Sequence, residues 1–185
     1  MSSRAVYLAK YRSAQNQRAH FAVFIPNAEH SHRDLAQDFA AAKCQGTVIH
    51  AVGEPLMAGY TVDIKRNRDC SNVPDLRGLF RLGQVETANV YEPPPGIESA
   101  DTARTTIERE ALSVPAPPRG QDIRAPIDGV ATKRCQEWTM EFLSKLEEKG
   151  LISSGAVSIA QSHRDPPSLG IFGFKNANKT IGSIE

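Results

Sequence analysis

The sequence predicts an α+β protein in which an antiparallel sheet of about four to six strands packs against an amphipathic helix that carries a cysteine at its start. Three observations lead to this prediction. Short β-branched and aromatic runs recur between residues 19 and 86. The links between these runs are too short for the crossovers that parallel strands need. The clearest helical pattern follows much later, at residues 135–149.

Composition is that of an ordinary globular domain. The chain has 185 residues, of which 40% are hydrophobic and 23% are charged, so we expect one domain over residues 1–185. Lysine and arginine total 22 against 21 acidic residues, which gives no basic excess for general nucleic-acid binding. No apolar run approaches the ~18 residues of a membrane span, and the N-terminus lacks a signal-peptide pattern. We therefore expect a cytoplasmic protein without a membrane span.

Four segments have the pattern of strands. "AHFAVFI" at residues 19–25 and "GTVIHAVG" at residues 46–53 are rich in β-branched and aromatic residues. Residues 59–67 and 78–86 alternate apolar and polar side chains, which is typical of strands with one exposed face. The first segment begins near His20, and the second contains His50. The charged run "DIKRNR" at the end of the third predicts an exposed strand end.

The predicted helix has one apolar stripe. Trp138, Phe142 and Leu146 recur every four residues, so this face packs on the sheet. Thr132 is a candidate N-cap, which would place Cys135 in the first turn.

The remaining segments are less regular. Proline-rich stretches at residues 92–98 and 113–120 bracket a predicted helix over residues 101–112, with Asp101 as its N-cap. Residues 100–112 could form a lid over a cleft or a plain connection. After the helix at 135–149, "LISSGAVSIAQS" predicts one more strand. Residues 1–17 are assigned to an N-terminal segment, and 153–185 to a C-terminal strand and an irregular tail.

A thiol at the start of a helix is a candidate nucleophile. The free N–H groups and the positive end of the helix lower the pKa of a nearby thiol, which favours the reactive thiolate. The same N–H groups can stabilise the oxyanion of an acyl-transfer intermediate. Histidine is the natural base for a thiol. On neighbouring antiparallel strands, one of His20 and His50 could contact Cys135 while the other orients it.

The order "AHFAVFI", "GTVIHAVG" and "RCQEWTMEFLSKL" resembles that of the circularly permuted papain-like thiol hydrolases and acyltransferases, the group that includes lecithin retinol acyltransferase. The resemblance covers residues 18–152 and implies a permuted papain-like core there. It implies Cys135 as the nucleophile, His20 as the general base and His50 as the orienting residue. Gln136 is the candidate for assisting the Cys135 N–H at the oxyanion. Arg134 stands where this family commonly has asparagine.

The function that these residues predict is cysteine-dependent acyl transfer. The enzyme would act on an amide, ester or thioester of a small molecule or peptide, through an acyl-enzyme on Cys135. Water would make it a hydrolase, as in thiol proteases. Another acceptor would make it an acyltransferase, including a small-molecule biosynthetic transferase that uses an aminoacyl donor. The alternative is a non-catalytic binding module on the same fold.

No cofactor or metal is expected. "HSHRD" at residues 30–34 directs two imidazoles to one side of an extended chain, and Cys44 follows nearby, but a set of four ligands with zinc-site spacing is absent. A solvated loop is the simpler interpretation. Cys44, Cys70 and Cys135 lie far apart without CxxC spacing, so we expect free thiols.

Overall fold

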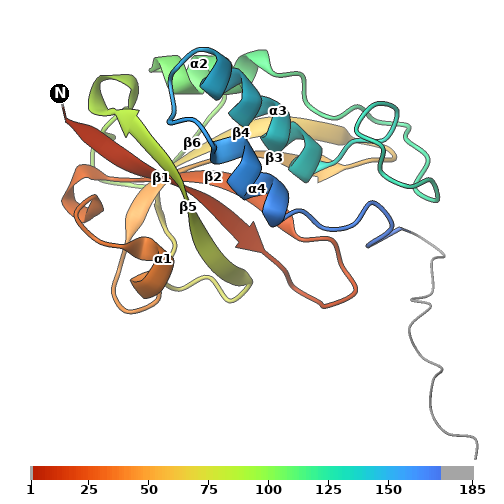
Figure 1. Cartoon of the computed structure of the whole chain (residues 1–185), viewed down its shortest axis with the longest axis horizontal. Helices are drawn as coiled ribbons and strands as arrows, with labels where there is room; N and C mark the ends of the chain where they lie inside the picture. The colour runs from red at the N-terminus through yellow and green to blue at the C-terminus, as the bar shows by residue number, and fades with distance from the viewer. Residues whose placement is uncertain (1, 172–185) are drawn as a thin grey trace, which may run out of the picture.

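The computed structural model describes residues 2–171, which form an α+β fold with a six-stranded antiparallel sheet in the order β5-β1-β2-β3-β4-β6 (Figure 1). This confirms the predicted fold class. The strands are β1 (Ser3–Tyr11), β2 (His20–Pro26), β3 (Gln45–Glu54), β4 (Gly59–Asp69), β5 (Leu76–Glu86) and β6 (Glu98–Ala100). The helices are α1 (Leu35–Asp38), α2 (Thr106–Ser113), α3 (Cys135–Glu148) and α4 (Ala156–Ser162), with short 3-10 turns at Ala28–His30 and Thr87–Asn89.

Both faces of the sheet are covered. Phe21 and Val23 of β2 point to one face and pack in a core with Trp138 and Phe142 of α3. Phe24, which follows Val23, points to the other face, where a second core includes Leu35 of α1. Figure 1 shows α3 and α4 side by side against the sheet. The apolar stripe predicted for α3 therefore packs on the sheet as expected.

The first strand corrects the assignment of residues 1–17 to an N-terminal segment. Residues Ser3–Tyr11 form β1, which pairs with both β2 and the edge strand β5. Tyr7 faces one core and Leu8 the other, each almost fully buried. A strand covered on both faces has no alternation of apolar and polar residues, and this removed the signal on which the sequence interpretation relied.

The segment after α3 is also different from its prediction. Residues 151–162 were expected to form a strand, but Ala156–Ser162 is the helix α4, which follows Gly155 at a φ of 99°. Its buried residues are Ala156 and Ala160, which are one helical turn apart. These small side chains let α4 pack closely against α3 and β5. The rest of the predicted tail, residues 172–185, lies outside the described residues.

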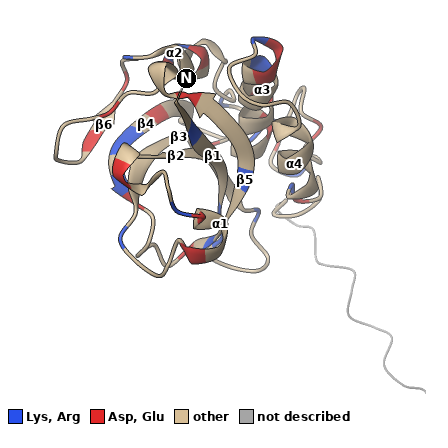
Figure 2. Cartoon of the chain, turned by 60° about the vertical axis from the view of Figure 1, so that its left-hand side comes forward, with Lys and Arg blue, Asp and Glu red and all other residues tan. Residues whose placement is uncertain are grey.

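The charged run at residues 63–68 is not simply an exposed strand end. Arg66 is fully buried, and its guanidinium forms ion pairs with Glu108 of α2 at 2.8 Å and with Glu98 of β6 at 3.0 Å. Burying this charge is tolerated because it is paired. In the view of Figure 2, cationic and anionic residues are mixed along β4 and the nearby helices. Within residues 2–171, no helix has the length and apolar character needed to cross a membrane.

Candidate active site

Cys135 is the first residue of α3. Arg134 occupies the N-cap position, and its backbone N–H donates to the Glu137 carboxylate at 3.0 Å. Thr132, the expected N-cap, instead donates through its hydroxyl to the carbonyl of Pro126 at 2.7 Å and belongs to the preceding loop. The helix therefore starts directly at the cysteine, and the unpaired N–H groups of its first turn lie beside the sulfur.

The two histidines meet across neighbouring strands. His20 begins β2 and His50 lies in β3, which pairs antiparallel with β2. The Nε2 atom of His20 is 2.8 Å from the Nδ1 atom of His50, and the rings are arranged edge to face. This contact leaves the Nδ1 atom of His20 and the Nε2 atom of His50 for other partners.

Asp63, which was not among the predicted site residues, lies beyond His50 as seen from His20. Asp63 of β4 lies opposite His50 in the strand register, and its Oδ2 atom is 3.8 Å from the His50 Nε2 atom. Lys65 also approaches the same oxygen, at 3.3 Å. The sequence could have predicted that Asp63 lies near His50, because a hairpin that turns at residues 54–59 brings residues 50 and 63 opposite each other.

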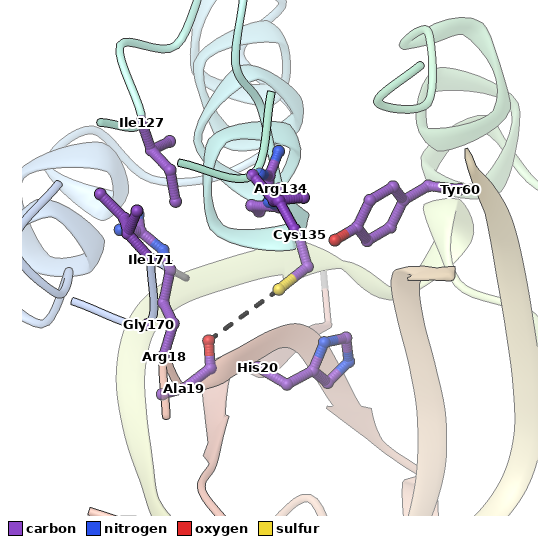
Figure 3. A pocket seen from close by; sticks show the side chains of 10 residues that line it. Arg18, Ala19, His20, Tyr60, Ile127, Arg134, Cys135, Gly170 and Ile171 are labelled. Carbon is purple, nitrogen blue, oxygen red and sulfur yellow. Dashed lines mark hydrogen bonds between the residues drawn. The ribbon is translucent and has the colours of Figure 1, made fainter. Parts of the chain in front are cut away.

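The thiol and the first histidine share one cavity of about 320 Å³. Figure 3 shows the sulfur of Cys135 above the ring of His20, with the hydroxyl of Tyr60 directed towards the same space. The sulfur is 3.9 Å from the carbonyl oxygen of Ala19. The rest of the wall consists of Arg18, Ile123, Ile127, Arg134, Gly170 and Ile171.

The Cys135 thiol and the two imidazoles rest uncharged at neutral pH. Burial raises the pKa of the Cys135 thiol to about 11, although the backbone N–H groups of Phe21 and Gln136 favour the thiolate. Burial also lowers the pKa of His20 to about 4 and that of His50 to about 3. We expected the helix start to lower the pKa of the thiol. In the folded protein the desolvation of the sulfur outweighs the helix end.

Gln136 does not reach the cavity. Its buried amide donates to the Ala19 carbonyl at 2.8 Å and to the Asp165 carboxylate at 2.9 Å, and it accepts from the Asp165 N–H at 3.0 Å. Asp165 in turn accepts from the Ala19 N–H at 2.7 Å. The Gln136 amide therefore ties the start of α3 to the residue before His20, and it is not available as an oxyanion donor.

Tyr60 is a site residue that sequence reasoning missed. It enters the cavity from the second residue of β4, where its backbone N–H donates to the Pro117 carbonyl at 3.2 Å. Burial raises the pKa of Tyr60 to about 12, so its hydroxyl stays protonated and able to donate a hydrogen bond. Nothing local in the segment indicated this role, because the position of Tyr60 depends on how the β3–β4 hairpin meets α3.

Other candidate groups lie apart from the cavity. Cys44 and Cys70 are buried in the core on the α1 side of the sheet, where the Cys70 N–H donates to the Cys44 carbonyl at 2.9 Å. His30 and His32 lie in the 3-10 turn and the loop after it. In the part of the chain that the structure describes, no group of three or more His, Cys, Asp or Glu side chains is placed to hold a metal ion. Residues 100–112 pack against α3 and β4 rather than lining the cavity.

The fold and the site define an α+β protein with a thiol and an imidazole facing one cavity. The chain belongs to a family of unknown function, DUF6540, whose model matches residues 6–153, from β1 to just beyond α3. No curated protein and no solved structure matches the chain.

Proposed function

We propose that this protein is a cysteine-dependent acyl-transfer enzyme with a permuted papain-like core, in which Cys135 is the nucleophile and His20 the general base. The observation that carries the proposal is that both side chains face one cavity, while His50 holds the far nitrogen of His20 at 2.8 Å. Thiol acyl transfer requires a nucleophile beside a base that a third group orients, and Cys135, His20 and His50 are the candidates for these three roles.

The hydrogen-bond chain selects one set of tautomers. To accept the thiol proton, neutral His20 needs a free lone pair on Nδ1, and its proton then resides on Nε2. That proton is donated to the Nδ1 atom of His50, so the proton of His50 resides on Nε2. The His50 Nε2 atom faces the Asp63 carboxylate at 3.8 Å. An anionic Asp63 favours charge on the imidazoles, whereas Lys65, which binds the same carboxylate, opposes it and lowers the pKa of both histidines.

The reaction follows from these positions. The Cys135 thiol transfers its proton to the Nδ1 atom of His20 while the sulfur bonds to the substrate carbonyl carbon. The carbonyl oxygen becomes an oxyanion, and the Tyr60 hydroxyl and the free N–H groups of the first turn of α3 are its donors. The leaving group then departs with the proton from His20. Water or another acceptor attacks the acyl-enzyme, gives its proton to His20 and releases Cys135 as a thiol.

The neutral resting state of the thiol and the imidazoles determines when the nucleophile forms. Proton transfer places a thiolate and an imidazolium in a buried cavity, and each charge favours the other. The pKa values of about 11 for Cys135 and about 4 for His20 oppose this transfer in the empty site. We infer that bound substrate and its developing oxyanion drive the transfer, so that thiolate formation and attack occur together.

The free state of the cysteines indicates the compartment in which the protein acts. Cys44, Cys70 and Cys135 are free. Because reduced thiols persist in the reducing environment of the cytoplasm, we propose that the enzyme acts there.

The test is to trap the acyl-enzyme. The protein would be mixed with p-nitrophenyl esters of small carboxylic acids, and the mass gained at each cysteine measured by peptide mass spectrometry. We expect acylation of Cys135, loss of it in Cys135→Ser, and a fall of about 10²- to 10⁴-fold in its rate in His20→Ala. Cys44→Ser is the matched control, since Cys44 lies in the other core. Equal acylation rates in wild type and His20→Ala would contradict the proposal.

The second candidate function is a binding module on the same fold. The raised pKa of Cys135 favours it, because a thiol with a pKa of about 11 is a poor nucleophile until a substrate assists it. Acylation of Cys135 distinguishes the acyl-transfer enzyme from the binding module. A binding module holds its ligand in the cavity without any acylation of Cys135, whereas the enzyme forms the acyl adduct. Transfer to an amine, including transfer from an aminoacyl donor, would appear as faster decay of that adduct when the amine is added.

A further inference from the structure

The walls of the cavity carry cationic groups. Arg18 and Arg134 both line it, and none of its lining residues in the described chain is acidic (Figure 3). The Arg134 guanidinium donates to the Gln121 side-chain oxygen at 2.6 Å and to the Lys133 carbonyl at 2.9 Å. Both acceptors are neutral. The charge of Arg134 is therefore not compensated by these contacts.

The carboxylates behind the wall are shared among several cations. Glu137 binds Arg18 at 2.5 Å and Arg164 at 2.7 Å, so one carboxylate serves two guanidinium groups. Asp165, which supports Ala19, is likewise shared by Lys10 and Arg12. The cavity wall and its support thus hold an excess of positive charge, although the whole chain has a formal net charge of only +1. Such an excess in a partly enclosed site attracts anions.

Arg18 is buried in the cavity wall and has one donor without an acceptor in the described part of the chain. Its side chain is only 9% exposed, and its terminal nitrogens bond to Glu137 and to the Pro166 carbonyl. Among residues 2–171 its Nε atom is buried without a hydrogen-bond partner. A buried donor without an acceptor is costly, so a ligand that supplies an acceptor would be stabilised there. In the view of Figure 3, the Arg18 side chain extends beside Ile127 and Ile171, away from Tyr60. A cationic group and an apolar surface therefore stand together on one side of Cys135.

We propose that the cavity selects acyl substrates that carry a carboxylate, with Arg134 and Arg18 binding the carboxylate and the isoleucines contacting an adjoining apolar portion. Guanidinium groups bind carboxylates through paired, charge-assisted hydrogen bonds. A volume of about 320 Å³ suits a small molecule or the end of a peptide. This inference rests on the proposed acyl-transfer function and specifies its substrate class.

Two alkylating reagents of similar size test the charge preference. Iodoacetate is anionic and iodoacetamide is neutral, and both convert a thiol into a stable adduct that mass spectrometry assigns to Cys135. The ratio of their rate constants at Cys135 would be divided by the same ratio for glutathione, which corrects for intrinsic reactivity. We expect the normalised ratio to be about tenfold or more in favour of iodoacetate.

Variants of the arginine separate charge from folding. Arg134→Gln should lower the normalised ratio severalfold, and Arg134→Lys should keep most of it. Arg124→Gln is the matched control, because Arg124 is exposed, lies in the same loop region and does not line the cavity. Thermal unfolding of each variant checks that the fold is retained. A normalised ratio near one in the wild type, or the same loss in Arg124→Gln, would overturn the inference.

Protection experiments identify the anion. Propionate at millimolar concentration should slow the reaction of Cys135 with iodoacetamide more than inorganic phosphate does. Stronger protection by phosphate would overturn the carboxylate assignment.

Failure of the proposed function can be distinguished from failure of the substrate class. Acyl transfer is rejected if the p-nitrophenyl esters leave Cys135 unacylated, or if Cys135 reacts equally fast in His20→Ala. If Cys135 depends on His20 but shows no preference for iodoacetate, only the substrate class is rejected.

Discussion

At the scale of single residues, burial sets the chemistry of the site. Cys135 is 8% exposed, and desolvation raises the pKa of its thiol while lowering the pKa of both histidines. A thiol that stays protonated until substrate arrives is protected against unwanted alkylation and oxidation. The hydrogen bond between His20 and His50, with the Asp63 carboxylate 3.8 Å beyond His50, then favours the imidazolium that proton transfer forms.

Gln136 gives a residue-scale prediction, because the structure uses it as a support rather than an oxyanion donor. Gln136→Ala leaves the Ala19 carbonyl and the Asp165 carboxylate without their amide partner. We expect the free energy of unfolding to fall by about 1 to 3 kcal/mol, as measured by chemical denaturation. The acylation rate of the remaining folded enzyme should change much less than in Tyr60→Phe, which removes a donor that faces the cavity. A larger rate loss in Gln136→Ala than in Tyr60→Phe would reverse these roles.

At the scale of elements, the site depends on how three segments meet. α3 presents Cys135 at its first residue, β2 presents His20 at its first residue, and β4 brings Tyr60. Asp165 and Gln136 connect the first two elements through Ala19. The ends of rigid elements thus carry the reacting groups, and the apolar stripe of α3 holds its end in place.

Arg66 gives the element-scale prediction, because it joins β4 to α2. Its guanidinium is fully buried and bonds to both oxygens of Glu108. Arg66→Ala would leave the Glu108 carboxylate buried and uncompensated, so the free energy of unfolding should fall by about 3 to 5 kcal/mol. Thermal or urea unfolding measures the change. Arg68→Ala is the control, since Arg68 lies two residues further along β4 and is exposed. Equal losses in the two variants would contradict the role of the ion pair.

At the scale of the whole molecule, the histidines link stability to pH. His20 and His50 bind protons more weakly in the folded chain than at the ordinary pKa of 6.5. Between about pH 6.5 and pH 4 the unfolded chain therefore binds more protons than the folded chain, and the free energy of unfolding falls as the pH falls. Their contribution is fully present above pH 6.5 and is lost on acidification.

This pH dependence is measurable by urea denaturation at a series of pH values. His20→Asn and His50→Asn remove the titrating groups one at a time, and each should flatten the curve between about pH 6.5 and pH 4 relative to the wild type. Carboxylates with lowered pKa values, such as Asp128, contribute at lower pH and are common to all variants. A curve of unchanged slope in both variants would show that the two imidazoles are not buried as neutral groups.

Much of the sheet could be predicted because its evidence is local. The segments at 19–25, 46–53, 59–67 and 78–86 correspond to β2, β3, β4 and β5. The four-residue repeat of large apolar side chains found α3. β1 was missed because it is covered on both faces, and α4 because its buried side chains are two alanines. Local patterns report the period of burial, and they fail where burial is complete or the side chains are small.

By itself, the sequence determined that Cys135 lies in the first turn of a helix and that His20 and His50 belong to strands, since periodicity depends on near neighbours in the chain. The tertiary structure alone decided that the two imidazoles touch, that Asp63 lies near His50 and that Tyr60 enters the cavity beside His20. It also placed the Gln136 side chain in a buried hydrogen-bond network outside the cavity. It also decided the protonation of the site. A pKa depends on the solvent and charges that the whole fold places around a group, and no short stretch of sequence contains that information.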